Sequence, residues 1–393
     1  MTPTLLFNPF NYIVLRRLAL FIGLVAFVSC AKDDAGAPLE HIPTARETQI
    51  LSWLQQQQLA NGLLESTENN NTVSLYDQSL AAMTFMLHNE VDRAEMIFDF
   101  FNDCRESELN QGVGGFSQFR DRNGIPGGHR WMGDNAWLLI ALNNYKALTG
   151  RSEYDALRAD LSTWLQALQD TSDGGLWAGY NAQNQRLSYK VTEGNIDAFN
   201  AISGYTPFHQ ELLHFLEIHR WNLEDQTLLA WPENPPYAYA VDCTSWAYCL
   251  FPNYPHSSLG TAQRFLNTQT STLTGNPIEG YDIDEDRDAI FMEGTVQMAL
   301  AWKLSGNSFQ YDRFIAELDK GFVLSTAHPE SGGFPYASNP GTAYGSDPYW
   351  NGADTEIAVS PGAWYLFALR GFNPFAVERQ KNMPTTDQFW RSE

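Results

Sequence analysis

Six acidic residues stand at the starts of six apolar, helix-like segments, where their side chains could do acid–base chemistry. They recur every 49 to 63 residues, at Asp77, Asp134, Glu193, Asp242, Glu293 and Glu356. Two carboxyl groups, one protonated and one ionised, can together cleave the bond between two sugar units. Asp and Glu are also favoured near the start of any helix, and this preference alone would explain most of the six. We therefore expect at most two or three of them to be catalytic.

The segment around Asp134 has the densest set of residue types that bind sugars. It reads HRWMGDNAW from position 129 to position 137. Flat aromatic rings stack on the C–H faces of pyranose rings, and polar side chains take the hydroxyl groups. We predict that Asp134 is catalytic and that His129, Arg130, Trp131 and Trp137 bind substrate.

Glu193 ranks beside Asp134, and it has a second acid nearby. Asp197 lies four residues later and shares a helix face with Glu193, so it is either catalytic itself or raises the pKa of Glu193 by like-charge repulsion. Gly194 leaves room for a ligand, and Asn195 is expected to bind it. Asp242, which precedes a Cys-Thr-Ser-Trp run, is the next catalytic candidate, and Glu293 comes fourth.

Further aromatic residues could form platforms for sugar rings. Besides Trp131 they are Trp177, Tyr180, Trp231, Tyr237, Trp246, Tyr344 and Trp350. We expect about half of this set to line a cleft. Among them we choose Trp177, Tyr180, Trp246 and Trp350 as substrate-binding residues.

An acidic run before the fifth apolar segment offers ligands for a metal ion. Acids stand at positions one, three, five, seven and twelve of this run, at Asp282, Asp284, Asp286, Asp288 and Glu293. The spacing imitates a calcium-binding EF-hand loop, but Arg287 stands where that loop needs Gly. A looser structural Ca²⁺ site and a solvated acidic loop are both open interpretations. The chemistry expected of the carboxyls requires no cofactor.

The six acids belong to a repeat of helical hairpins. The apolar segments begin near Leu75, Gly133, Thr192, Val241, Met292 and Glu356, and amphipathic segments with charged faces lie between them. A helix that is apolar nearly all round is buried on both sides, whereas an amphipathic helix covers it from outside. Repeats of this length indicate a solenoid or a closed ring. Gly-rich loops precede several inner segments, and short β-hairpins are expected in 114–130, 174–191 and 332–350.

This pattern resembles the six-hairpin glycosidase superfamily, whose fold is an all-α (α/α)6 toroid. GDNAWLLIALNNYKALTG, TEGNIDAF, EGTVQMALAWKLSG and the closing GAWYLFALRGFNPF carry the resemblance, which covers 45–376. It implies six hairpins with short β-hairpin loops at the cleft end, followed by a tail, 377–393. In such a ring the inner helices all begin at one end, so the six acids would converge on one funnel. The fold also serves polysaccharide lyases, sugar epimerases and lanthionine cyclases.

The N-terminus predicts export and a lipid anchor. Arg16 and Arg17 precede an apolar run too short to span a membrane, and Cys30 follows a small residue at its end. We expect residues 1–29 to be a lipoprotein signal peptide, Cys30 to be lipidated and 30–44 to be a flexible tether. The acidic residues after Cys30 resemble the export tag of surface lipoproteins of the Bacteroidetes group. This predicts an outer-membrane lipoprotein, exposed at the surface or facing the periplasm.

Composition limits the partners. The 393 residues carry a formal net charge of -22, which argues against nucleic acid and disfavours polyanionic sugar chains. Cys104, Cys243 and Cys249 are expected to be buried thiols, since an odd number cannot all pair. We expect a monomer that hydrolyses a neutral oligo- or polysaccharide with paired carboxyls. The alternatives are a glycan-binding lipoprotein without activity, and a lyase or epimerase that uses His129 with Arg130.

Overall fold

The computed structural model describes residues 42–68, 70–340 and 353–391. The predicted signal peptide, Cys30 and the two aromatic candidates Tyr344 and Trp350 lie outside the described residues. From Ala45 onward the chain forms one compact unit. Among its described helices, none is both long enough and apolar enough to cross a bilayer.

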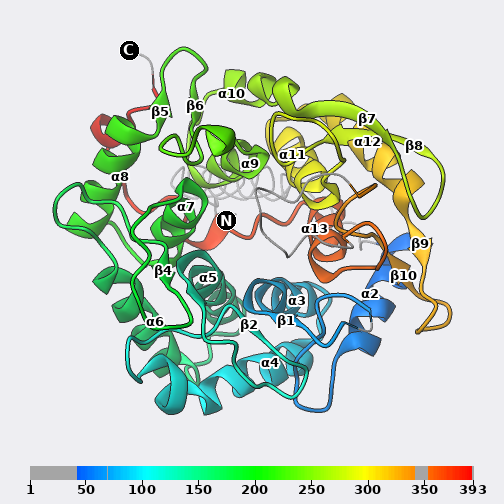
Figure 1. Cartoon of the computed structure of the whole chain (residues 1–393), viewed down its shortest axis with the longest axis horizontal. Helices are drawn as coiled ribbons and strands as arrows, with labels where there is room; N and C mark the ends of the chain where they lie inside the picture. The colour runs from blue at the N-terminus through cyan, green and yellow to red at the C-terminus, as the bar shows by residue number, and fades with distance from the viewer. Residues whose placement is uncertain (1–41, 69, 341–352, 392–393) are drawn as a thin grey trace, which may run out of the picture. The chain divides into compact units, whose positions relative to one another are not determined.

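Six inner helices stand side by side in a closed ring, as predicted (Figure 1). They are α3 (Leu75–Leu87), α5 (Met132–Thr149), α7 (Thr192–Ala201), α9 (Val241–Leu250), α11 (Met292–Leu304) and α13 (Val359–Arg370). Each contacts the next, and α13 closes the ring against α3. Nearly every residue of these helices is buried, which is why their sequences are apolar on all sides.

Six outer helices surround the ring, so the fold is the predicted (α/α)6 toroid (Figure 1). They are α2 (Ala45–Gln57), α4 (Val91–Asp103), α6 (Asp155–Ala167), α8 (Pro207–His219), α10 (His256–Thr261) and α12 (Ser308–Leu318). Each packs against an inner helix, and all except the short α10 also carry charged residues, as the amphipathic pattern indicates. Glycines Gly150 and Gly371, at positive φ, end α5 and α13.

Short antiparallel strand pairs join the helices, with partners that differ in part from those predicted. The pairs are β1 (Val73–Ser74) with β2 (Phe119–Arg120), β3 (Arg130–Trp131) with β4 (Gly179–Tyr180), β5 (Trp221–Asn222) with β6 (Thr227–Leu228), β7 (Leu266–Thr270) with β8 (Pro277–Tyr281), and β9 (Val323–Leu324) with β10 (Gly332–Gly333). The first two pairs link loops of successive repeats rather than forming local hairpins. The longest pair, β7 with β8, was not predicted.

The C-terminal segment packs across the ends of inner helices. Asn144 of α5 and Asn200 of α7 donate side-chain hydrogen bonds to the carbonyls of Pro374 and Phe375, at 2.9 and 3.0 Å. The Phe375 ring lies 5.1 Å from that of Trp137. Further along, the buried Trp390 indole donates to the Pro252 carbonyl. The segment thus covers the inner helices at the end opposite their first turns.

Candidate functional site

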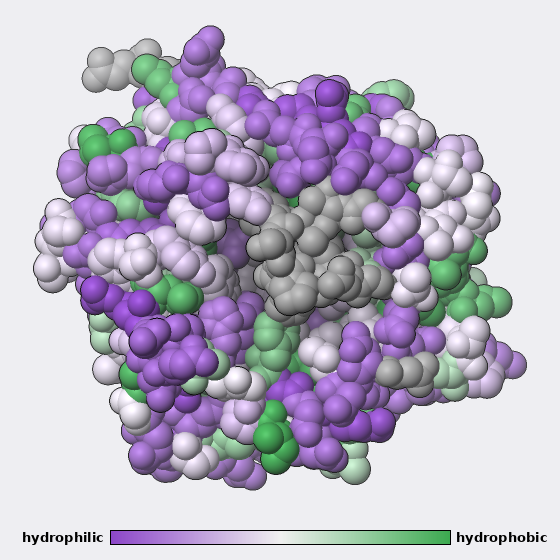
Figure 2. Space-filling model, in the orientation of Figure 1, coloured by the Kyte–Doolittle hydropathy of each residue, from purple (hydrophilic) through white to green (hydrophobic). Residues whose placement is uncertain are grey.

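A cavity of about 1120 Å³ opens where the inner helices begin. All six acids of the repeat line it, as the predicted funnel requires: Asp77, Asp134, Glu193, Asp242, Glu293 and Glu356. Glu356 does so from the loop before α13, because that helix begins later than predicted, at Val359. Figure 2 shows this view of the molecule hollowed near its middle, with mainly hydrophilic residues around the hollow.

Two successive helical turns supply the side chains of the cavity. The second residues of the six inner helices are Tyr76, Gly133, Glu193, Asp242, Glu293 and Ser360, and all of them line the cavity. Residues four positions later share the same helix face, and four of these also line it: Trp137, Asp197, Trp246 and Gln297. The repeat therefore builds an upper layer rich in acids and a lower layer rich in tryptophan.

The fourth residue of an inner helix fixes the loop that precedes the helix. The Asn135 side chain accepts from the Phe116 N–H at 2.8 Å and donates to the Phe116 carbonyl at 3.0 Å. Gln78 makes the same pair of bonds to Leu64. Asn195 makes them to Leu176, and Thr295 makes them to Tyr281. Four loops are thus tied to four helices, which holds the rim of the cavity in place.

Glu193 and Asp242, the second residues of α7 and α9, share a side-chain hydrogen bond. Burial, the negative charge of Asp242 and this bond raise the pKa of Glu193 well above its usual value. The pKa of Asp242 is also raised by burial, but the bond from Glu193 favours its ionised form. The arrangement is that of a protonated Glu193 donating to an ionised Asp242. The Trp131 indole also bonds to Glu193.

Asp134 and Asp197 keep oxygens free for a ligand. Asp134 Oδ2 and Asp197 Oδ1 are buried and have no hydrogen-bond partner among the described residues. Burial, followed by the charge of Asp77, raises the pKa of Asp134 well above the usual range. Burial, followed by the charges of Glu193 and Asp242, does the same for Asp197. Buried polar atoms normally have partners, so these oxygens mark places where a ligand can bind.

Glu293 is held from three sides by hydrogen-bond donors. The Tyr76 hydroxyl and the Gln297 amide donate to Oε1, and the Ser360 hydroxyl donates to Oε2. Burial raises its pKa to about 7, against the opposing effect of these donors. Tyr76 in turn accepts from the Trp364 indole at 2.8 Å. These contacts tie α3, α11 and α13 together at the lining of the cavity.

An aromatic wall forms one side of the cavity; we use this term for Trp131, Tyr189, Trp231 and Tyr237. The Tyr189 and Trp231 rings are stacked, with centroids 4.7 Å apart, and Tyr237 stacks on the other side of Trp231. Trp131 lies 6.2 Å from Tyr189 and completes the row. The wall leads from Glu193 along the loops before α5, α7 and α9, and all four of its residues line the cavity.

Of the predicted binding residues, His129, Trp131, Trp137 and Trp246 line the cavity. Arg130 does not: its guanidinium donates to the carbonyls of Gly115 and Gly128, which fixes the loop.

Three other predicted binding residues also lie outside the lining. The Trp177 ring packs against Arg186 and Lys190. Tyr180 is the β-sheet partner of Arg130. The Asn195 side chain accepts a hydrogen bond from the backbone N–H of Leu176. The interpretation of Gly194 was also wrong: a Cβ there would lie 2.8 Å from Met132, so this glycine permits close helix packing rather than ligand access.

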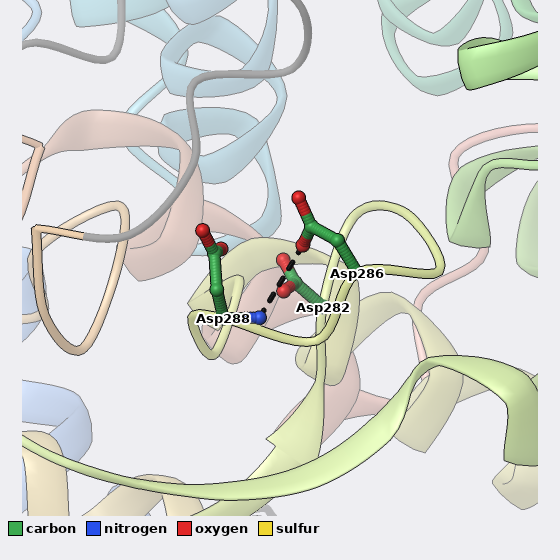
Figure 3. Close-up of side chains that lie close together, drawn as sticks. All are labelled: Asp282, Asp286 and Asp288. Carbon is green, nitrogen blue, oxygen red and sulfur yellow. Dashed lines mark hydrogen bonds between the residues drawn. The ribbon is translucent and has the colours of Figure 1, made fainter.

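The predicted five-residue calcium set is not assembled. Figure 3 shows Asp282, Asp286 and Asp288 close together in the loop after β8. Each of them offers one carboxylate oxygen within 4.8 Å of the others. Asp284 is not in this group, and Glu293 lies in the cavity, where Tyr76, Gln297 and Ser360 hold it. The buried Asp282 accepts from the N–H groups of Ile283 and Ala289, which closes the loop.

Several lining residues were missed, although a signal for them was present. Tyr76 and Ser360 occupy the second position of their helices, where other repeats carry Glu or Asp. Alignment of the six inner helices by their first residues would have placed both in the cavity. Tyr189 and Gln118 lie in loops of irregular length, and no pattern marks them. Of the cysteines, Cys243 and Cys249 are buried as predicted, whereas Cys104 is partly exposed.

Comparison with solved structures returns toroids of sugar-active enzymes. A glycosidase solved in complex with glucose has a TM-score of 0.58 and 11% identity, over 85% of this chain and all of that one. An α-amylase from Clostridium perfringens gives 0.58 and 10% over the same shares. Cellobiose 2-epimerase from Bacillus thermoamylovorans gives 0.54 and 11%, over 83% and 97%. No family model and no curated protein matches the sequence. These likenesses establish the fold.

Proposed function

We propose that the protein is a glycoside hydrolase that acts on an oligo- or polysaccharide without acidic groups. The observation that carries the proposal is the contact between the Glu193 and Asp242 carboxyls, in one cavity with the unpartnered Asp134 oxygen. Hydrolysis of a glycosidic bond needs a proton donor for the leaving oxygen and a carboxylate on the other side of the sugar. The sugar-active neighbours of the same fold support this chemistry.

In this proposal Glu193 is the general acid. Its raised pKa keeps a proton available near neutral pH, and Asp242 and Trp131 fix its orientation. Asp134 is the second carboxyl, and in its ionised form it activates water, or attacks the sugar, with its unpaired oxygen. Asp197 lies one turn below Glu193, burial raises its pKa, and its unpaired oxygen accepts a hydrogen bond from a sugar hydroxyl. The free N–H of the buried Trp246 is available for a sugar hydroxyl.

The lining disfavours the lyase alternative. Lyases that act on acidic sugars need a cation to neutralise the substrate carboxylate. Among the described residues of the lining, His129 is the one basic residue. Its predicted partner Arg130 is turned to backbone carbonyls of its own loop. The cavity is therefore better suited to hydrolysis by carboxyls than to neutralising an acidic sugar.

A panel of neutral glucans and mannans tests the proposal. Wild-type protein should release reducing ends from at least one of them, and Glu193→Gln and Asp134→Asn should each lower the rate by about 10²-fold or more. Glu106→Gln, an exposed change far from the lining, is the matched control and should leave the rate unchanged. Binding without any release of reducing ends would instead support the alternative, a glycan-binding protein without activity.

We also propose that the protein is exported and anchored in the outer membrane through a lipid on Cys30. The support is the short apolar run that ends at this cysteine. Metabolic labelling with a radioactive fatty acid should mark the wild-type protein and not Cys30→Ala. Equal labelling of the two proteins would contradict the anchor.

A further inference from the structure

The cavity carries an excess of acidic groups. Seven carboxyls line it, namely the six acids of the repeat and Asp197. Among the described lining residues only His129 is basic. Burial raises the pKa of Asp77 to about 7 and raises the pKa values of Asp134 and Asp197 well above their usual range. These carboxyls therefore hold protons that a cation can replace when it enters.

Three of these carboxyls have an oxygen without a partner among the described residues: Asp77 Oδ1, Asp134 Oδ2 and Asp197 Oδ1. Their residues are only 1%, 8% and 1% exposed. All three line the cavity, and Asp134 interacts electrostatically with both of the others. A buried acceptor without a donor is unfavourable, and this is most costly for a charged group. The three oxygens are thus suited to a ligand that donates several hydrogen bonds and carries positive charge, because a nearby cation favours the ionised form of these carboxyls.

An ammonium group meets this requirement. It has three N–H donors, no acceptor and one positive charge. The aromatic wall beside the carboxyls also attracts cations, through the negative faces of its rings, and stacks on sugar rings. An acetamido group or a hydroxyl lacks the charge, and a uronic acid has the wrong sign.

We propose that the cavity recognises an amino sugar, with the protonated amine of a glucosamine-type residue bound by Asp77, Asp134 and Asp197. This inference rests on the proposed function only in taking the ligand to be a glycan. It narrows the substrate class from sugar chains without acidic groups to chains that carry free amines. In this proposal Asp134 has two tasks, because it binds the amine and is also the second carboxyl of the hydrolysis.

Calorimetry with three tetrasaccharides tests the inference at about pH 6.5, where primary amines are protonated. The ligands are the tetramers of glucosamine, of N-acetylglucosamine and of glucose. The protein is the whole chain with Glu193→Gln, which blocks turnover. The glucosamine tetramer should bind about tenfold more tightly than either uncharged tetramer, and this preference should shrink as salt rises. Equal or weaker binding of the glucosamine tetramer overturns the inference.

Single substitutions show which carboxyls cause the preference for the glucosamine tetramer. Asp197→Asn and Asp77→Asn should each weaken binding of the glucosamine tetramer about tenfold and leave the glucose tetramer nearly unchanged. Asp103→Asn, an exposed change on an outer helix, should change neither. A calcium chloride titration tests a metal ion as the ligand. If calcium binds through the same carboxyls and abolishes the preference for the amine, the three oxygens belong to a metal site and the inference is overturned. The comparison of ligands on the parent protein stands even if a variant fails to fold.

The two proposals fail separately. Cleavage of a neutral glycan with no preference for the amine would leave the hydrolase standing and remove the amino-sugar specificity. Tight binding of the glucosamine tetramer to wild-type protein without cleavage would do the reverse.

Discussion

Glu193 and Asp242, on neighbouring inner helices, share a hydrogen bond between their carboxyl groups. Such a bond requires a proton, because two ionised carboxylates in contact repel each other. The pair therefore titrates as a unit, with the proton held mainly by Glu193. The pair thus keeps a protonated carboxyl in the cavity at neutral pH. The Trp131 side chain bonds to that carboxyl, which belongs to Glu193.

The pH dependence of activity should report this pair. Activity should fall as pH rises through the pKa of Glu193, because the leaving group then lacks its proton. Asp242→Asn removes the negative charge that raises this pKa. The alkaline limb of kcat/KM should therefore move to lower pH, by about one unit or more. An unmoved limb, or a shift to higher pH, would show that the two carboxyls are not coupled.

Stability should fall as pH rises from about 4 to about 7. Burial raises the pKa of Asp77 from 3.8 to about 7. In this window the folded chain holds a proton that the unfolded chain releases, so rising pH favours unfolding. Asp77→Asn should flatten the fall by a few kcal/mol, measured as urea unfolding at both ends of the window. The same pH dependence in the variant and the wild type would refute a protonated Asp77.

The hydrogen bonds between the Asn135 and Asn195 side chains and the preceding loops should stabilise the fold. Asn135→Ala leaves the buried N–H and carbonyl of Phe116 without these partners, at a cost of about 1–3 kcal/mol in the free energy of unfolding. Asn195→Ala should cost a similar amount through Leu176. The exposed Asn110→Ala serves as the control in the same denaturant titration. If these variants lose no more unfolding free energy than the control does, the loops do not depend on the asparagine hydrogen bonds.

Variants of two tryptophans distinguish substrate binding by the aromatic wall from a purely structural role. Trp231→Ala removes the middle ring of the Tyr189–Trp231–Tyr237 stack and should raise KM for a tetrasaccharide about tenfold. Trp177 lies outside the cavity lining and packs on Arg186, so Trp177→Ala should lower the melting temperature and leave KM unchanged. Steady-state kinetics and thermal melts of both variants check this, and a KM that responds only to Trp177 would reverse the assignment.

The sequence predicted those features that every helical hairpin shares for the same physical reason. Burial on all sides makes the inner helices apolar, and residues such as Asp134 and Glu193 recur at one turn because each helix begins at the same cavity. That regularity predicted the ring and the funnel of acids. It also contained Tyr76 and Ser360, which a search restricted to acidic residues passes over.

Residue type alone could not tell a ligand contact from a structural one. Arg130 and Asn195 are typical sugar-binding residues, yet both are occupied by backbone groups of the loops. The partners lie in irregular loops, 19 residues before Asn195 in its case, where no periodicity predicts a contact. The role of Gly194 likewise depends on Met132 of the neighbouring helix. Such contacts follow from tertiary packing and not from local spacing.

The most direct test of the central claim compares wild type with Glu193→Gln on two substrates that differ in their leaving group. One is the natural glycosidic bond, whose leaving oxygen needs a proton, and the other is a dinitrophenyl glycoside of the same sugar, which does not. If Glu193 is the general acid, the variant should lose about 10²- to 10⁴-fold in rate on the first and less than about tenfold on the second. Equal losses on both substrates would contradict the account.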